Sequence, residues 1–314
     1  MMEKKEFKNL SISFILALIV YGVVMFATSS GIIDRYWSGI IIVAGINIVL
    51  ATSLNLASGY LGQLTLGHAG FMSVGAYVSA IFTLSFQTPF FVSLLVGALA
   101  AAIIGLIIGI PTLRLKGDYL CIITLAFNEI IRVIMLNLEI TNGAKGLMGI
   151  PRSSNFTVVF ISVCITIYCI YSIVKSRQGR AMISIREDEI ASELSGIPTS
   201  YFKIMAFVIS AFFAGLAGGL YAHYMGMLVP KTFDYNKSVE ILVMVVLGGL
   251  GNLKGSVIAA IVMTVLPEFL REFADYRMLL YAVVLIATMI IKEKNLTSRF
   301  AGKFSKKKKE EVSE

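Results

Sequence analysis

The sequence predicts an all-α, polytopic membrane protein, a transmembrane helical bundle of about nine or ten segments. Of its 314 residues, 57% are hydrophobic and only 15% are charged, whereas a soluble domain carries about a quarter charged residues. The mean hydropathy is +0.83, and most of the chain consists of long apolar runs. A water-soluble chain of this composition would lack the polar surface to cover its core, so soluble and disordered classes are excluded.

Eight apolar runs have a length that fits a membrane span. A helix needs about 20 apolar residues to cross a hydrocarbon layer about 30 Å thick, because it rises about 1.5 Å per residue. The runs are 10–28, 36–57, 68–86, 90–110, 119–138, 158–174, 202–224 and 278–291. The first run is alternatively a signal peptide cleaved at Ala27-Thr28-Ser29. It exceeds the usual 7–15 apolar residues of such a peptide, which favours a retained helix.

A ninth apolar stretch, 238–267, is too long for one simple span. Polar and glycine residues interrupt its middle: Gly248, Gly249, Gly251, Asn252, Lys254 and Gly255. We expect two short helices that form a hairpin or two short crossings. The pattern Gly248-x-x-Gly251-Asn252-Leu253 echoes Gly59-x-x-Gly62-Gln63-Leu64, as a duplicated architecture would, although glycine turns also recur by chance.

Two further runs carry small residues four positions apart. The first stripe is Gly97, Ala101, Gly105 and Gly109. The second is Ser210, Ala214, Gly218 and Ala222, with Ala211, Gly215 and Gly219 beside it. In lipid, small residues let helix backbones approach closely. We therefore interpret both stripes as packing surfaces, with the lining of a pathway as the alternative.

The charges predict an orientation. The net charge is +8, and basic residues cluster near Lys4, near Arg114, between 175 and 186, and after 291. Basic segments favour the cytoplasmic side, so we expect both termini and the loop 175–201 to be cytoplasmic. The loops at Asp34, 141–151 and 227–237 then lie outside. Residues 1–292 form the membrane domain, and 293–314 form a basic tail near anionic lipid headgroups.

The loop 175–201 predicts one short helix on the membrane surface. Acidic residues precede Ala191, and Gly196 with Pro198 ends the helix. Its apolar stripe comprises Ile183, Ile190 and Leu194. Such a helix fits a groove in a partner protein, with a merely solvated helix as the alternative.

Several polar residues fall within predicted spans, where charges are unfavourable and tend to mark function or pairing. Glu129 and Arg132 are three residues apart and so can pair with each other. A structural ion pair and a transport role are equally supported. Asn47 and Asn55 are expected to bond across helices.

The sequence contains no pattern for metal, redox or nucleotide chemistry. Cys121, Cys164 and Cys169 lie in apolar runs without CxxC spacing, and His68 and His223 stand alone. No GxxxxGK[ST] phosphate loop occurs. We therefore expect no metal, no cofactor, no catalytic residue and no motor within the chain. Without interleaved aromatic and basic residues, no nucleic-acid partner is expected.

An ordered set of motifs spans roughly residues 53–277. It comprises 58–71 with Gly75-Ala76-Tyr77, 113–119, 124–132, 141–151, 211–221, 246–251 and Leu266-Pro267-Glu268. In order and spacing this set resembles ABC-importer permeases, specifically those of the branched-chain amino acid uptake type.

The resemblance implies a multi-pass subunit of a prokaryotic cytoplasmic (inner) membrane importer, surrounded by membrane lipids. Its partners would be a second permease subunit, as a heterodimer, two cytoplasmic ATP-binding subunits and an extracytoplasmic binding protein. The wider class has Glu-Ala-Ala-x-x-x-Gly in its coupling loop. Here Ala191, Ser192 and Gly196 fit that spacing, but Ile190 takes the place of the acid, which Glu189 precedes.

The candidate site residues fall into three groups. Candidates for coupling to the ATPase are Arg180, Arg186, Glu187, Glu189, Ala191 and Gly196. Candidates for the pathway or its packing are Gln63, His68, Asn128, Glu129, Arg132, Gly248 and Gly249. Candidates for docking of the binding protein are Thr141, Asn142, Gly143, Lys231 and Asp234.

Other functions are weighed against this one. Related permeases carry urea or short amides. A self-contained secondary transporter would need a buried ionisable residue, for which Glu129 is the one strong candidate, beside Arg132. A membrane enzyme would need clustered His, Asp or Glu residues, and the two isolated histidines argue against it.

Overall fold

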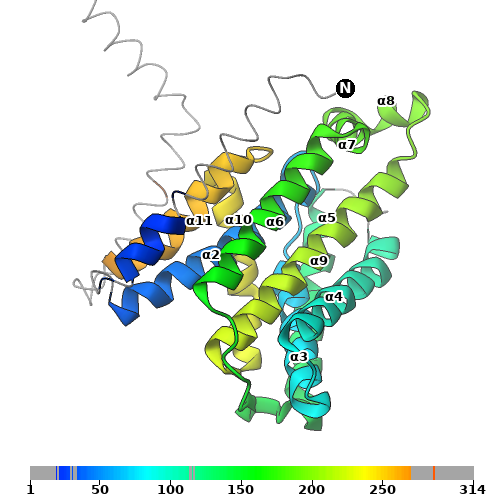
Figure 1. Cartoon of the computed structure of the whole chain (residues 1–314). Helices are drawn as coiled ribbons and strands as arrows, with labels where there is room; N and C mark the ends of the chain where they lie inside the picture. Colours follow the sequence, from blue (N-terminus) through cyan, green and yellow to red (C-terminus); the bar gives the residue numbers. More distant parts are fainter. Residues whose placement is uncertain are drawn as a thin grey trace, which may run out of the picture. The chain divides into compact units, whose positions relative to one another are not determined.

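The computed structural model describes residues 19, 21–28, 30, 34–112, 115, 117–269 and 286. The chain divides into two compact units, 1–261 and 262–314, and the first contains nearly all the described residues. Most of these residues are helical, which confirms the all-α class (Figure 1). Apart from Ile286, the expected span 278–291 and the tail 293–314 lie outside the described residues.

Six helices within the described residues are long and apolar enough to cross a membrane. They are α2 (Arg35–Asn55), extended by the π-helix η1 (Leu56–Tyr60), then α3 (His68–Phe86), α4 (Phe90–Thr112), α5 (Asp118–Asn137), α6 (Phe156–Lys175) and α9 (Thr199–Met225). Each matches one predicted run. Of the expected first span, residues 21–28 are helical, and Tyr21 stacks on Phe156 of α6 with ring centroids 5.8 Å apart.

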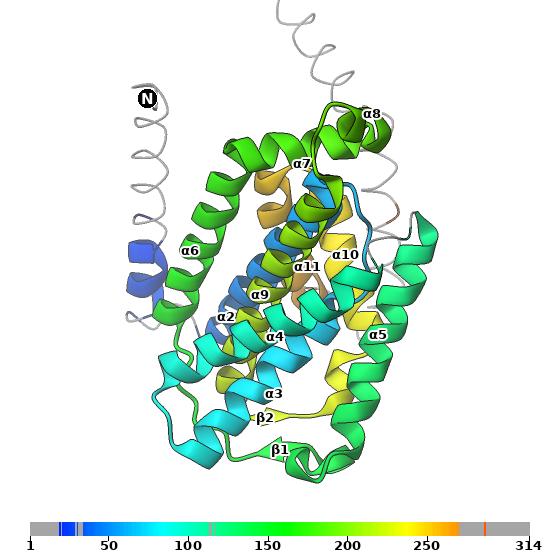
Figure 2. The ribbon, with the colours of Figure 1, turned by 90° about the vertical axis from the view of Figure 1, so that its right-hand side faces the viewer.

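Shorter elements connect these helices. They are η2 (Glu139–Thr141), η3 (Gly143–Lys145), β1 (Leu147–Met148), α7 (Arg177–Glu187), α8 (Glu189–Leu194), β2 (Met227–Leu228), η4 (Pro230–Phe233), α10 (Tyr235–Gly248) and α11 (Leu253–Phe269). Strands β1 and β2 pair antiparallel, with Leu147 opposite Leu228. Figure 2 shows α7 and α8 at one end of the bundle and β1 and β2 at the other.

Helices α3, α4 and α9 pack closely against one another through small residues. A Cβ built on Gly97 of α4 would lie 2.5 Å from the carbonyl oxygen of Gly75 in α3, and one on Gly105 would lie 2.6 Å from the Cβ of Ala211 in α9. Such contacts are closer than side chains allow. The packing interpretation of both stripes is therefore confirmed.

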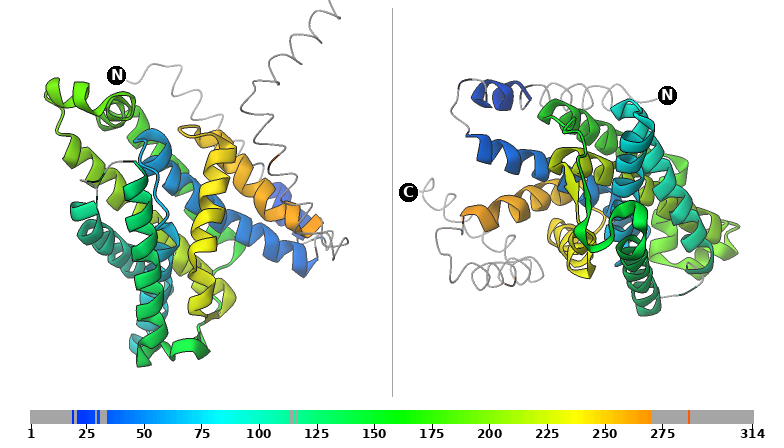
Figure 3. Two further views of the ribbon diagram at one scale, coloured as in Figure 1. Left: turned by 180° about the vertical axis from the view of Figure 1, so that it is seen from behind. Right: turned by 90° about the horizontal axis from the view of Figure 1, so that it is seen from below.

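Helices α10 and α11 are the two short helices expected for 238–267, and Figure 3 shows them from behind. Gly249 and Gly251 occupy left-handed backbone conformations, with φ of +97° and +77°, which glycine adopts without steric penalty. Across the turn, Gly248 at the end of α10 packs directly against Gly255 and Ser256 of α11. A Cβ built on Gly248 would lie only 2.5 Å from the Cα of Ser256. The glycine cluster in 238–267 thus serves both to turn the chain and to bring the two helices together.

Candidate functional site

The loop 175–201 forms two short helices, so the expectation of a single helix is wrong. Ser176 caps α7 by accepting a hydrogen bond from the backbone N–H of Gly179 at 3.3 Å. Asp188 interrupts the helix and caps α8, since its Oδ1 accepts bonds from the backbone N–H groups of Ile190 at 2.9 Å and Ala191 at 3.0 Å. An aspartate at an N-cap satisfies amides that a continuous helix would have bonded otherwise. Gly196, with φ +83°, ends α8.

The two helices differ in burial. In α7, Met182 and Ile185 are buried and hold the helix to the bundle. In α8, Ile190 is 65% exposed and Leu194 is 85% exposed. Ile183, expected in the same apolar stripe, is only half-exposed. The apolar surface of this loop therefore consists of Ile190 and Leu194, at one end of the bundle.

The charged candidates of the loop have different surroundings. Glu189 forms an ion pair with Lys203 of α9, with 2.7 Å between Oε1 and Nζ, and Lys203 is only 5% exposed. Arg186 is exposed, and its Nε donates to Glu187 Oε1 at 3.1 Å, while its Nη1 donates to the carbonyl oxygen of Gly59 at 3.0 Å. Arg180 and Glu187 are exposed. Of the acidic candidates, Glu187 thus stays at the surface, whereas Glu189 fastens α8 to α9.

The two similar glycine turns of the sequence lie against each other in space. The side-chain Oδ1 of Asn55 accepts a hydrogen bond from the backbone N–H of Gly251 at 2.9 Å, and its Nδ2 donates to Ser256 Oγ at 3.0 Å. The backbone of Gly59 is so close to Gly251 that no Cβ fits on Gly59. Cross-helix bonding by Asn55 is therefore confirmed. Asn47 also bonds across helices, because its Oδ1 accepts from Lys237 Nζ at 3.4 Å.

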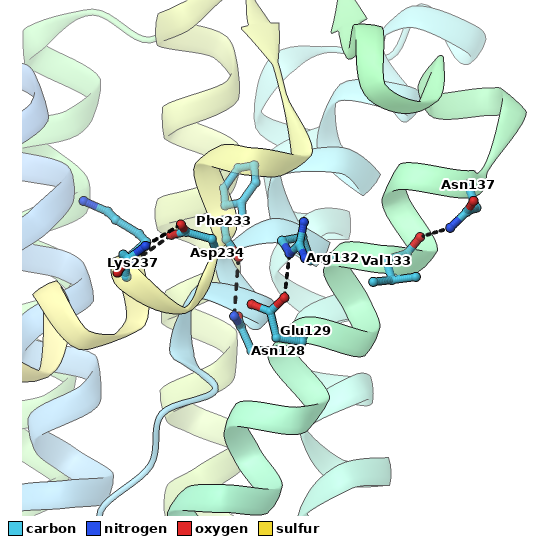
Figure 4. A network of polar contacts seen from close by, with 9 residues as sticks. Asn128, Glu129, Arg132, Val133, Asn137, Phe233, Asp234 and Lys237 are labelled. Atoms are coloured by element: carbon cyan, nitrogen blue, oxygen red, sulfur yellow. Dashed lines mark hydrogen bonds and ion pairs between the residues drawn. The ribbon is translucent and has the colours of Figure 1, made fainter.

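Helix α5 carries a polar cluster in the middle of a membrane span (Figure 4). Arg132 Nε donates to Glu129 Oε2 at 2.7 Å, which confirms the expected ion pair, and the two side chains are 28% and 31% exposed. Asn128 is buried, and its Nδ2 donates to the carbonyl oxygen of Phe233 at 3.4 Å. Asn128 Oδ1 and Glu129 Oε1 are buried acceptors with no hydrogen-bond donor in the described structure. Unpaired buried acceptors are energetically unfavourable.

Gln63 lies within an irregular segment, 61–67, and His68 follows that segment as the first residue of α3. The imidazole Nε2 of His68 lies 2.9 Å from Ser53 Oγ, and Ser238 Oγ accepts a bond from the backbone N–H of Ala69 at 3.1 Å. His68 is fully enclosed by these neighbours. Gln63 Oε1 is another buried acceptor without a donor among the described residues.

The docking candidates lie at the opposite end from α7. Thr141 is buried, and its hydroxyl donates to the carbonyl of Met135 at 2.6 Å. It therefore stabilises the turn after α5 and presents no side-chain surface to a docking protein. Asn142 is exposed and Gly143 is half-buried, both with positive φ. Lys231 is exposed. Asp234 caps α10, accepting from the backbone N–H of Lys237 at 3.1 Å.

Two lysines, Lys237 and Lys203, form side-chain interactions in the structure but are not among the candidates chosen from the sequence. Lys237 Nζ lies 3.1 Å from Glu240 Oε2 and also reaches Asn47. The i,i+3 spacing of Lys237 and Glu240 is a detectable signal. Lys203 pairs with Glu189, which lies 14 positions earlier on another helix, so no local pattern reveals that contact.

Long apolar helices and close helix contacts through glycine define a polytopic membrane protein. The sequence model of the family described as the permease component of the branched-chain amino acid transport system matches residues 36–291. The chain belongs to this family of ABC-system permeases.

Relatives of known name support the assignment. The chain is 34% identical to the high-affinity branched-chain amino acid transport system permease protein LivM of Escherichia coli strain K12, over 90% of this chain and 74% of that protein. It is 24% identical to the probable LivM of Methanocaldococcus jannaschii, over 74% and 81% of the two chains. It is also 26% identical to the ribose import permease RbsC of Escherichia coli strain K12, over 81% and 82%. No solved structure matches the chain.

Proposed function

We propose that this chain is the membrane subunit of an ATP-driven importer of branched-chain amino acids in a prokaryotic inner membrane. The 34% identity to LivM supports this substrate class. The ribose permease among the relatives indicates that the fold itself accommodates other solutes, so substrate choice rests on the family match. The chain would carry no ATPase activity and would work with a second permease, two ATP-binding subunits and an extracytoplasmic binding protein.

The exposed surface of α8 is the main structural support for a partner that binds ATP. Leu194 and Ile190 protrude from a helix at one end of the bundle, next to an exposed Ala191 and Gly196. A short helix with two protruding apolar side chains and a polar surround is suited to a groove in a soluble protein. The basic residues around 175–186 favour the cytoplasmic side for this end, where ATP-binding subunits lie.

The opposite end, with Asn142, Gly143, Lys231 and the β1–β2 pair, would then face the binding protein. Exposed Lys231 is the charged docking candidate of this end, and complementary charges guide such encounters. Asp234 caps α10. It would affect docking only indirectly, by fixing the position of the neighbouring η4. Both chain termini would lie in the cytoplasm.

Between the two ends, α5 offers the polar surface expected of a translocation path. Asn128 and Glu129 each keep a buried acceptor without a donor in the described structure. In alternating access, ATP binding closes the ATPase pair, the loop 175–201 moves with it, and the subunits rock around the path. Gly248 and Gly249 would serve as the turn about which the α10–α11 hairpin adjusts.

Copurification tests the proposal. The chain, extracted in mild detergent with the ATP-binding subunits encoded beside it, is expected to retain them, and Leu194→Asp with Ile190→Asp is expected to release them. Glu193→Gln, an exposed change on the same helix, is the matched control. If the wild-type chain retains no ATP-binding subunit, the motor-driven importer is wrong. If the double variant retains them fully, α8 is not the contact.

A further inference from the structure

Arg186 on α7 reaches both glycine turns from an exposed position, where its Nε also donates to Glu187 Oε1 at 3.1 Å. Its Nη1 donates to the carbonyl oxygen of Gly59 at 3.0 Å. A Cβ built on Gly251 would lie 2.8 Å from the same nitrogen, and one on Gly62 would lie 2.6 Å from Arg186 Cγ. A side chain at Gly62 or at Gly251 would therefore collide with Arg186.

The contact with Gly59 has a physical reason. Gly59 lies in the last turn of η1, which continues α2, and carbonyl groups at the end of a helix lack intrahelical donors. A guanidinium carries five N–H donors in a fixed planar arrangement, and a cation is favoured at a helix C-terminus. Arg186 thus caps the α2–η1 helix from a different part of the chain, 127 positions away.

The two turns that Arg186 touches are themselves joined. Asn55 bonds both Gly251 and Ser256, so the end of α2–η1 and the start of α11 are connected by side-chain and backbone contacts. Met182 and Ile185 are buried on α7. Through Arg186, α7 is therefore linked to both the α2–η1 end and the α10–α11 turn.

We propose that Arg186 is a positioning residue that transmits movement of the loop 175–201 to both glycine turns, and that it does not bind the ATP-binding subunit. This inference rests on the proposed importer function. It separates two tasks within one loop: α8, with Ile190 and Leu194, contacts the partner, and Arg186 on α7 carries the movement into the membrane helices. It also accounts for the similar sequence of the two turns, since both must leave room for one arginine.

The test uses the complete transporter in proteoliposomes, with both permeases, the ATP-binding subunits, the binding protein and radiolabelled leucine. Arg186→Gln is expected to retain the ATP-binding subunits and their ATP hydrolysis, while leucine uptake per ATP falls about tenfold, in the range by which changes along a coupling route act. Arg186→Lys keeps the positive charge and N–H donors but loses the planar guanidinium, and is expected to recover part of the uptake. Arg177→Gln removes the same charge from an exposed position on α7 and is expected to behave as wild type.

A second pair of variants tests the space around Arg186. Gly62 and Gly149 both have φ +80°, but only a Cβ at Gly62 meets Arg186, whereas one at Gly149 meets nothing within 4 Å. Gly62→Ala is expected to reduce uptake per ATP and Gly149→Ala is not. This pair decides the question if Arg186→Gln fails to fold.

The outcomes are distinguishable. Loss of the ATP-binding subunits from Arg186→Gln would show that Arg186 belongs to the docking surface and would overturn the inference. Unchanged uptake per ATP in Arg186→Gln would overturn it as well. Failure of the proposed function itself would appear earlier, as absence of ATP-dependent uptake by the wild-type transporter.

Discussion

Gly75 of α3 and Gly215 of α9 lie in direct backbone contact. A Cβ built on Gly75 would lie 2.5 Å from the carbonyl carbon of Gly215, closer than any real side chain allows. Glycine weakens a helix by about 1 kcal/mol relative to alanine. The close packing of α3, α4 and α9 offsets that cost, because dispersion contacts rather than hydrophobic burial hold helices together in lipid.

Gly75→Ala is therefore expected to destabilise the bundle by about 2 kcal/mol, since the added methyl group overpacks a backbone contact. Gly22→Ala is the matched control, because a Cβ on that helical glycine meets nothing within 4 Å. Thermal unfolding in detergent measures both. Equal melting temperatures for the two variants would contradict the close contact.

Lys203→Ala is expected to lower the free energy of unfolding by about 2 kcal/mol, because it removes the partly buried ion pair between Lys203 and Glu189. The loss stays below the range for a fully buried pair, since the Glu189 side chain is 28% exposed and water can reach it. Glu193→Ala, on the exposed face of α8, is the control and should stay within about 0.5 kcal/mol of wild type. Denaturant titration of the purified chain checks both, and an unaffected Lys203→Ala would show that the pair does not hold α8 to α9.

Asn55→Ala removes an acceptor for the Gly251 amide and a donor to Ser256 at a fully buried position. We expect a loss of about 2 kcal/mol, because buried groups are left without partners. Asn137→Ala removes one exposed bond to Val133 and is expected to have little effect. Proteolysis of the α10–α11 turn gives a local readout: faster cleavage near Gly251 in Asn55→Ala only is the expected result, and equal cleavage in both would contradict the role of Asn55.

Glu129 and Arg132 provide a charge test within a membrane span. Either single neutral variant, Glu129→Gln or Arg132→Gln, leaves one unpaired charge, which is unfavourable by about 2.5–3.5 kcal/mol at a helix centre on insertion scales. The double variant leaves none. We expect more correctly inserted protein from the double variant than from either single one, as measured by the folded fraction after extraction. If the double variant is the worst of the three, the residues act separately and not as a pair.

Much of the fold could be predicted because membrane helices are local features. Run length located the six long helices, and the spacing of Gly97, Gly105 and Ala211 showed which faces pack. The cluster after Gly248 predicted the hairpin. Each of these signals lies within one segment of the chain and depends on backbone geometry or hydrophobicity alone.

The site was less predictable, because its contacts join distant segments. The division of the loop at Asp188 depends on a side chain that caps α8 instead of continuing α7. The meeting of Gly59 with Gly251, and the contact of Arg186 with both, requires three segments to converge. Thr141 is a polar residue in a loop, yet it is buried, because its hydroxyl group donates a hydrogen bond to the backbone carbonyl of Met135. Only three-dimensional packing determines these features.

Leucine uptake into vesicles tests the central claim most directly. The vesicles contain this chain, its partner permease, the ATP-binding subunits and the binding protein, and matched vesicles lack only the ATP-binding subunits. An ATP-driven permease predicts accumulation of leucine in the complete vesicles when ATP is supplied, and none in the matched vesicles. Leucine accumulation that persists without the ATP-binding subunits would contradict the account and favour a self-contained secondary transporter.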